Sequence, residues 1–185
     1  MRRFRRGDVV TIGLEAGVVR LAAYTPVWQE LYQREERAIR GIIGEHVLDI
    51  QHVGSTAVPG VVAKPIIDIA VAVAEYEAAR VCIEPMEQLG YEYRGPYGIP
   101  GRHYFVRGEP RTHHVHMLEL DNIEWRRLIL FRDALRSDAA LVAEYSRLKG
   151  RLAEQFPNDR VAYTDGKAAF VNRVIDAAAG KSRPA

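Results

Sequence analysis

The sequence predicts an α/β (α+β) protein in which helices cover one mixed β-sheet and a helical segment completes the chain. Over the first two thirds of the chain, apolar and alternating runs typical of strands are interspersed with stretches of helical spacing. After Asp121 only the helical spacing continues. Sheets and helices of this kind bury their apolar faces against one another in layers. We therefore expect one domain over residues 1–180, with the sheet at about 17–120 and the helical part at about 121–179.

The composition agrees with a folded domain that has a hydrophobic core. The chain has 185 residues, of which 48% are hydrophobic and 27% are charged. Its formal net charge of +2 is too small to indicate general binding to nucleic acids or membranes. Cys82 is the only cysteine, which excludes an internal disulfide, and its apolar neighbours favour a packed side chain over a reactive thiol.

The two ends of the chain show no sign of membrane insertion or export. Residues 1–6 are basic, and the apolar stretch that follows is interrupted by Asp8, Glu15 and Arg20, so a signal peptide is not expected. No segment reaches the uncharged length of a membrane span. We expect a cytoplasmic protein without a membrane partner. The basic start is interpreted as a frayed tail, or alternatively as a weak anion-binding arm, and residues 181–185 as a disordered tail.

Local signals place the elements of the sheet part. Thr25 and Pro26 together are a typical helix start, and Gly90 is a typical helix end. A strongly apolar run indicates a buried strand, and the Pro/Gly cluster before the last two strands indicates a turn. The expected order is strand 18–22, helix 26–44, strand 47–53, loop with a short helix 54–64, strand 65–73, helix 75–90, strand 91–93, turn 95–101, and a hairpin of strands 102–107 and 112–120 whose tip is 108–110.

Three helices are expected in the last third, at 125–136, 138–156 and 160–179. Asp138 and Asp159, each after a small polar residue, are plausible caps between them. Trp28 and Trp125 have apolar neighbours at helical spacing, which favours core contacts over base stacking.

The turn after the strand at 47–53 is the first candidate functional element. Gly54 removes the side chain where the backbone must turn, and Ser55 can cap the residues that follow. Backbone N–H groups exposed at such a helix start suit a phosphate. The Gly-Lys-Ser/Thr ending of a P-loop is missing, so the motif is not a P-loop. The alternative interpretation is an ordinary strand-to-helix turn.

A single carboxylate stands on the next strand. Alternation places Asp68, Ala70 and Ala72 on one face of the strand and its β-branched residues on the other. An Asp beside two small residues is typical of a cavity floor, and a buried carboxylate needs a cation, a donor or a ligand. Alternatively, loop amides satisfy it.

The hairpin strand adds histidines. His114 and His116 share one face, and His113 lies on the other. If the first face meets Asp68, two imidazoles and a carboxylate converge, a set that suits zinc, manganese or iron better than magnesium. The same set suits proton transfer, or anion binding by a charged imidazole. Alternatively, these histidines are structural.

Basic residues supply candidate anion contacts. Arg102 follows a glycine turn and is placed to reach a carboxylate or phosphate. Lys64 precedes Pro65 and could pin a loop or touch a substrate. Three further pairs lie one helical turn apart, for which a solvated face or a surface ion pair is the usual interpretation. They are Arg132 with Arg136, Tyr145 with Lys149, and Tyr163 with Lys167.

The run HVGSTAVPGVVAKPIIDI at 52–69 resembles the signature of the GrpB family. The resemblance covers roughly residues 18–178, which is nearly the whole chain. Further matching segments follow in order: GIPGR at 98–102, HHVH at 113–116, FRDALR at 131–136, EYSRLK at 144–149 and AYTDGK at 162–167.

The resemblance implies a nucleotidyltransferase-like fold and relatives fused to dephospho-CoA kinase. In nucleotidyltransferases a Gly-Ser turn holds the triphosphate, and an Asp-x-Asp strand with a third carboxylate binds two divalent metals. Here Ala70 stands where the second carboxylate belongs, so standard two-metal chemistry is in doubt. The resemblance also favours Lys149 and Lys167 as residues of the cleft.

These observations predict a group-transfer enzyme acting on a nucleotide or a small anionic substrate, with acyl or aminoacyl transfer as another use of the cleft. The alternative is a non-catalytic nucleotide- or anion-binding module that has lost the second carboxylate. A nucleic-acid partner such as a tRNA end is a third hypothesis, which the low net charge disfavours. The expected catalytic residues, which are also the candidate ligands of a divalent Mg, Mn or Zn ion, are Asp68, His114 and His116. The expected substrate- or phosphate-binding residues are Gly54, Ser55, Thr56, Lys64, Arg102, Lys149 and Lys167.

Overall fold

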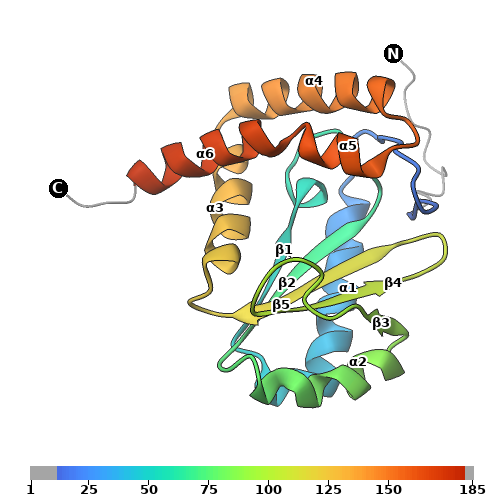
Figure 1. Cartoon of the computed structure of the whole chain (residues 1–185), viewed down its shortest axis with the longest axis vertical. Helices are drawn as coiled ribbons and strands as arrows, with labels where there is room; N and C mark the ends of the chain where they lie inside the picture. The colour runs from blue at the N-terminus through green and yellow to red at the C-terminus, as the bar shows by residue number, and fades with distance from the viewer. Residues whose placement is uncertain (1–11, 182–185) are drawn as a thin grey trace.

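A five-stranded mixed sheet forms the centre of the molecule (Figure 1). The computed structural model describes residues 12–181. The strands run in the order β1-β2-β5-β4-β3, in which β2 and β5 are parallel and the other neighbours are antiparallel. The mixed α/β sheet expected from the sequence is thus confirmed. The strands are β1 Asp49–Val53, β2 Ile67–Val73, β3 Tyr91–Tyr93, β4 Arg102–Arg107 and β5 His113–Glu119.

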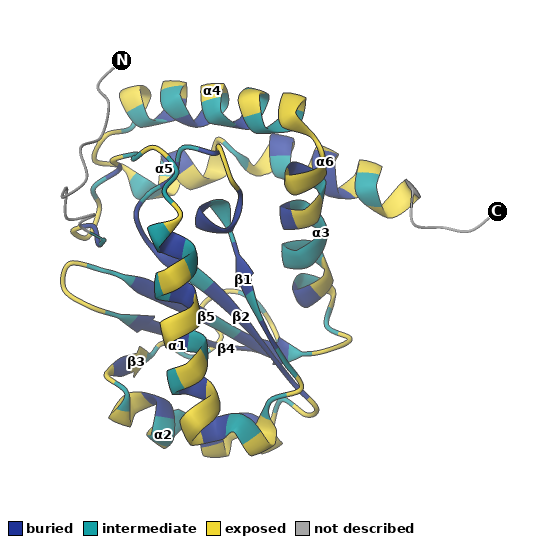
Figure 2. Ribbon diagram, turned by 180° about the vertical axis from the view of Figure 1, so that it is seen from behind, coloured by how far each residue is buried: buried dark blue, intermediate teal, exposed yellow. Residues whose placement is uncertain are grey.

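One face of the sheet packs against α1 (Val27–Ile43) and α2 (Ile83–Gln88). Ile67, Ile69, Val71 and Val73 of β2 lie on this face and are at most 2% exposed. Trp28 of α1 is fully buried against them, as its apolar neighbours predicted. Figure 2 shows the buried strands behind α1. This side holds the largest cluster of buried apolar side chains. Removal of this apolar surface from water stabilises the packing of α1 and α2 on the sheet.

The other face of the sheet meets the C-terminal helices. Ala70, Ala72 and Leu118 pack against Trp125 of α3 in a smaller cluster. The helices that follow cross above the sheet (Figure 1). The expected caps are formed, since Asp138 accepts from the Ala140 and Leu141 amides and Asp159 from the Ala162 amide. These helices are α3 Ile123–Ser137, α4 Ala139–Gln155, α5 Arg160–Asp165 and α6 Ala168–Lys181.

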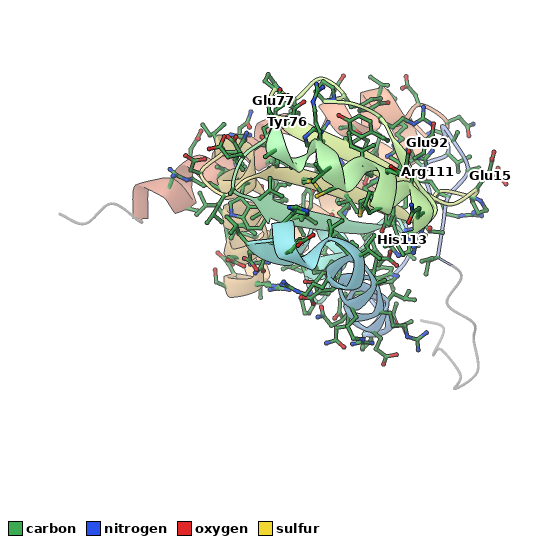
Figure 3. The ribbon with its side chains drawn as sticks, turned by 90° about the horizontal axis from the view of Figure 1, so that it is seen from below. Glu15, Tyr76, Glu77, Glu92, Arg111 and His113 are labelled. Atoms are coloured by element: carbon green, nitrogen blue, oxygen red, sulfur yellow. The ribbon has the colours of Figure 1, made fainter. Side chains whose placement is uncertain are left out.

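A partly buried ion pair ties α1 to the far end of the sheet. Arg107 donates from two nitrogens to the two carboxylate oxygens of Glu35, at 2.7 and 2.5 Å. The Tyr91 hydroxyl donates to the same carboxylate at 2.9 Å. His113 lies beside α1 in the view from below (Figure 3), with its Nε2 3.9 Å from Glu35. His113 therefore belongs to this network on the α1 side of the sheet.

Three predicted elements differ from the structure. Residues 18–22 form no strand, because Val19 bonds to Pro157 and Ala22 to Ala63, so their backbone partners lie in different segments. The helix expected at 75–90 is split into a 3-10 helix, η3 (Ala78–Cys82), and α2, which carries Pro85 and so lacks one backbone donor. The helix expected at 160–179 breaks at Gly166, where α5 ends.

The predicted ends lie mostly outside the described part of the chain. The basic start at 1–6 and all of the tail after Lys181 are not described, while α6 continues two residues beyond the predicted end at 179. Between residues 12 and 181, no helix combines the length and apolarity needed to cross a bilayer.

Candidate functional site

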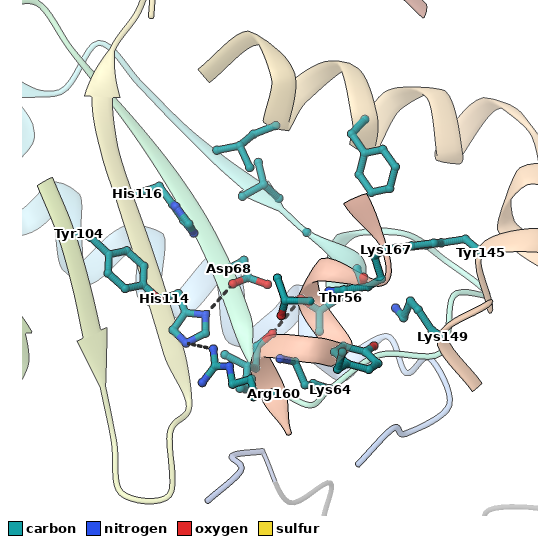
Figure 4. Close-up of a pocket in the computed structure, with 18 residues that line it drawn as sticks. Thr56, Lys64, Asp68, Tyr104, His114, His116, Tyr145, Lys149, Arg160 and Lys167 are labelled. Carbon is teal, nitrogen blue, oxygen red and sulfur yellow. Dashed lines mark hydrogen bonds and ion pairs between the residues drawn. The ribbon is translucent and has the colours of Figure 1, made fainter. Parts of the chain in front are cut away.

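A cavity of about 360 Å³ lies between the sheet and the C-terminal helices (Figure 4). Its size falls within the range of small-molecule sites. Its walls come from the end of β1, the turn after it, β2, β4, β5 and the helices α3 to α5, so segments far apart in the sequence meet here. The lining side chains used below are Gly54, Ser55, Thr56, Lys64, Asp68, Tyr104, His114, His116, Tyr145, Lys149, Arg160, Tyr163 and Lys167.

The parallel register of β2 and β5 brings the predicted carboxylate and histidines together. Asp68 pairs with His114 and Ala70 with His116, which places these residues on one face. His114 Nδ1 donates to Asp68 Oδ1 at 2.8 Å. The His114/His116 face therefore meets Asp68, while Ala70 on the same face is fully buried and packs against Trp125. The hydrogen-bond partner of this Oδ1 atom is therefore an imidazole and not a loop amide.

The Gly-Ser turn is built against the same carboxylate. Gly54 has φ +69° and ψ −169°, a conformation essentially restricted to glycine. A Cβ atom at this position would lie 2.5 Å from Asp68 Oδ2. The 3-10 helix η2 (Ser55–Ala57) follows directly. Glycine is therefore required here both for the turn and for the close approach to Asp68.

Side chains of the turn itself and of α3 hold the turn in place. The hydroxyl of Thr56 donates to the Ile66 carbonyl at 3.3 Å and lies 3.1 Å from His52 Nε2, so it is already engaged within the protein. Arg136 donates to the Ala57 carbonyl at 3.0 Å. Arg132 is buried and donates to the His52 carbonyl at 3.1 Å. The surface interpretation of Arg132 is wrong, because its guanidinium satisfies a backbone carbonyl beneath α3.

Three lysines converge on the cavity from different segments. Lys64 and Lys167 lie over the same Tyr163 ring, at 5.3 and 4.6 Å from its centroid. Lys149 lies 4.7 Å from the centroid of Tyr145. It is 2% exposed, and no hydrogen-bond partner of its Nζ is found among residues 12–181. The surface interpretation of the Tyr145/Lys149 pair is therefore wrong, because the pair faces inward.

Burial and mutual repulsion make these lysines easy to deprotonate. Burial, together with the charges of Arg160 and Lys167, lowers the pKa of Lys64 to about 7. Burial lowers the pKa of Lys167 to about 8, with Asp68 opposing and Arg160 assisting the change. Burial and the other two lysines hold the pKa of Lys149 well below its ordinary value. The cationic lining can therefore respond to what the cavity contains.

Asp68 remains the carboxylate of the site. Burial alone would raise its pKa, but the hydrogen bond from His114, with the basic side chains around it, outweighs burial and leaves the pKa below its ordinary value. Burial lowers the pKa of His116 to about 3, so this ring is neutral. A negative charge thus lies on the cavity floor between neutral or cationic neighbours.

Two arginines fix the tautomers of the histidine pair. A guanidinium can only donate, so Arg102, 3.1 Å from His116 Nδ1, requires the lone pair there and leaves the proton on Nε2. Arg160 lies 3.3 Å from His114 Nε2, which assigns that lone pair in the same way. Arg102 also donates to the Pro96 and Tyr97 carbonyls, and it lies behind His116 rather than in the lining of the cavity.

A divalent metal held by Asp68, His114 and His116 does not fit this arrangement. Both ring nitrogens of His114 are engaged, and His116 accepts from Arg102 on Nδ1. Ligation requires free imidazole lone pairs, and the lysines add repulsion for a cation. Within the described part of the chain, no group of three or more His, Cys, Asp or Glu side chains could hold a metal ion.

Sequence reasoning missed Arg160, Tyr104, Tyr145 and Tyr163 as residues of the cavity. Arg160 is the first residue of α5, where neither periodicity nor spacing indicates an inward direction. Tyr104 lies on β4 opposite His116, which only the pairing of the hairpin reveals. For Tyr145 and Tyr163, the one-turn spacing to Lys149 and Lys167 was a usable signal.

Comparison with known proteins identifies relatives over nearly the whole chain. The family described as "GrpB protein" matches residues 18–177. The chain is 35% identical over 171 residues to glutamate-rich protein GrpB of Alkalihalophilus pseudofirmus, covering 89% of this chain and 98% of that protein. It is 39% identical over 154 residues to UPF0157 protein YqkA of Bacillus subtilis, covering 83% of this chain but only 45% of the length of YqkA. A 76-residue segment is 38% identical to dephospho-CoA kinase of Mycolicibacterium paratuberculosis, covering 40% of this chain and 19% of that protein.

Solved structures agree with the fold. The crystal structure of conserved protein GrpB from Enterococcus faecalis matches with a TM-score of 0.83 and 38% identity, covering 88% of this chain and 98% of that chain. The poly(U) polymerase Cid1 matches with a TM-score of 0.50 and 12% identity, covering 71% of this chain and 44% of that chain, which shows a likeness of fold to a nucleotidyltransferase. The chain belongs to the GrpB family.

Proposed function

We propose that this protein binds a nucleotide, or another small molecule with several phosphate charges, in the cavity and performs group transfer on it. The observation that carries this proposal is the charge of the lining: Lys64, Lys149, Lys167 and Arg160 surround the single carboxylate of Asp68. A partly enclosed cavity with a surplus of basic groups favours an anion with several charges.

The proposed roles follow from position. The three lysines and Arg160 hold the phosphate charges, and the backbone N–H groups of Gly54 and Ser55 add donors at the turn. Arg102, which the sequence suggested as a direct contact, instead holds His116 so that Nε2–H donates toward the cavity. Thr56 supports the turn through its engaged hydroxyl.

Asp68 and His114 supply the proposed chemistry. Asp68 accepts from Nδ1 of His114, which keeps the lone pair on Nε2. When Arg160 turns from Nε2 to the bound phosphate, this nitrogen takes the proton of an acceptor hydroxyl. The acceptor oxygen bonds to the α-phosphorus of the triphosphate while the bond from this phosphorus to the α–β bridging oxygen breaks, and pyrophosphate leaves with the electron pair. The lysines and Arg160 that hold the pyrophosphate stabilise the negative charge that it gains.

A non-catalytic binding module is the second candidate. Ala70 favours it, because the strand carries one carboxylate where nucleotidyltransferases of the family's fold carry two. In that case the cavity still binds its anion, but the protein transfers no group.

Two measurements on the same protein separate these functions. Thermal unfolding is followed with ATP, GTP, CTP and UTP, each with EDTA and with manganese, because a bound ligand raises the melting temperature. Pyrophosphate release is then followed with candidate acceptors, which include an RNA oligonucleotide because Cid1 is a poly(U) polymerase.

The variant Asp68→Asn gives the decisive comparison, with Asp176→Asn on the exposed side of α6 as its control. Turnover that Asp68→Asn reduces at least about 100-fold, and Asp176→Asn does not, supports the enzyme. Stabilisation without turnover supports the binding module. Neither stabilisation nor turnover with any of the four nucleotides rejects nucleotide binding in this cavity.

A further inference from the structure

The placement of lysine in this protein is highly uneven. The chain contains 22 arginines but only four lysines, at 64, 149, 167 and 181. Three of the four line the one cavity described above. Arginine keeps its proton in proteins, whereas a buried lysine readily loses its proton. Apart from Lys181, the rest of the molecule uses arginine for its permanent positive charge, whereas the cavity collects lysines, which can be either charged or neutral.

Lys149 is the clearest case. Its Nζ is buried and finds no acceptor between residues 12 and 181, and its nearest ring is that of Tyr145 on the same helix. The charged groups that face it are Lys167 from the α5–α6 junction, Lys64 from the segment before β2, and Asp68 from β2. A buried ammonium that lacks an acceptor and has two like charges nearby is costly, whereas an amine at that position is much less so.

We propose that this cavity captures a multiply charged anion together with protons, and that Lys149 is an uncharged amine until the anion binds. This inference rests on the proposed function and deepens it. An anion supplies the acceptors and negative charge that the lysine cluster lacks, so protonation and binding become coupled. The ligand class is a compact anion with three or more charges, such as a triphosphate, because each added charge stabilises a further protonated lysine.

The pH dependence has a definite sign. Lys64 and Lys167 have pKa values lowered to about 7 and about 8, and binding an anion moves them back toward their ordinary value of 10.5. Proton uptake on binding therefore occurs between these lowered values and 10.5, and anion affinity falls as the pH rises through this window. Asp68 stays ionised throughout and contributes no proton in this range.

Calorimetric titration with ATP in EDTA at pH 8 tests the proposal, because ATP has lost nearly all of its phosphate protons at that pH. Titrations in buffers of different ionisation enthalpy give the protons exchanged per ATP bound. We expect uptake of about one to two protons in the wild type and about one fewer in Lys149→Met, with affinity weakened in the variant. Arg147→Met, which removes an exposed charge from the same helix, should leave the uptake unchanged.

The outcomes distinguish a failure of this inference from a failure of the proposed function. ATP binding without proton uptake, or with equal uptake in Lys149→Met, overturns the inference and leaves the proposed function intact. If ATP does not bind, the titration is repeated with GTP, CTP and UTP, and binding of none of the four rejects nucleotide binding and the inference with it. If Lys149→Met does not fold, nitrogen spectra of wild-type protein labelled in its four lysines decide, because Nζ of Lys149 should change from amine to ammonium when ATP is added. An ammonium already present without ATP contradicts the proposal.

Discussion

At the scale of single residues, the site depends on two close contacts. Gly54 lies against the carboxylate of Asp68, and Arg102 determines which nitrogen of His116 carries the proton. In the proposed function Gly54 also offers its backbone N–H to the anion, whereas Arg102 binds no ligand itself. The two contacts determine the position of the Asp68 carboxylate and the protonation of His116.

Gly54→Ala tests the first of these contacts. The backbone conformation is nearly closed to alanine, and the new Cβ would displace Asp68, so we expect a loss of about 1–3 kcal/mol in the free energy of unfolding. We also expect nucleotide-induced stabilisation to be lost. Denaturant titration measures the first and thermal shift with ATP the second. Gly41→Ala, inside α1 with open space around it, should instead stabilise by about 0.5–1 kcal/mol. A fully stable Gly54→Ala protein that still binds ATP would refute this account.

At the scale of elements, alternation along β2 and β5 predicted which strand residues share a face. Because side chains on a strand alternate, the faces of Asp68, His114 and His116 could be read from the sequence, and the parallel register joined them. Alternation and helical spacing report only on neighbouring residues, which explains why some residues of the cavity and some element bounds were predicted wrongly. Arg160 stands at a helix end, where no period says which way a side chain points, and Pro85 and Gly166 interrupt helices whose apolar spacing continues. The contacts of residues 18–22 lie with Ala63 and Pro157, which local spacing cannot reveal.

The attachment of α1 to the sheet is open to a direct test. Glu35→Ala leaves Arg107 and Tyr91 without their carboxylate, and we expect it to lower the free energy of unfolding by about 3 kcal/mol. Glu36→Ala removes the neighbouring, more exposed partner of Arg40 and should cost about 0.5 kcal/mol or less. Denaturant titration of both variants gives the comparison. Equal losses would show that the ion pair of Glu35 contributes no more than a surface pair.

At the scale of the whole molecule, buried histidines make stability depend on pH. Burial lowers the pKa of both His52 and His113 from 6.5 to about 4, with Arg136 and Arg132 adding to it at His52 and Arg107 at His113. Below pH 6.5 the unfolded chain therefore binds more protons than the folded one. Stability is complete above this pH and falls as the pH drops toward 4, by up to about 1.4 kcal/mol per unit for each histidine.

Denaturant titrations at pH 6.5 and pH 5 check this dependence, and histidine variants separate the histidines from the cavity lysines. His113→Gln should reduce the difference between the two values, and the exposed His46→Gln should not. Equal stability of the wild type at both pH values would contradict the assignment of neutral buried histidines.

The cavity walls come from distant parts of the chain: Asp68 lies at the floor, while Lys149 and Lys167 arrive roughly eighty to a hundred residues later. A ligand that touches all three would link the sheet to the last helices. Because α5 is only six residues long and makes few contacts of its own, its amide protons should exchange with solvent more slowly once the ligand is bound.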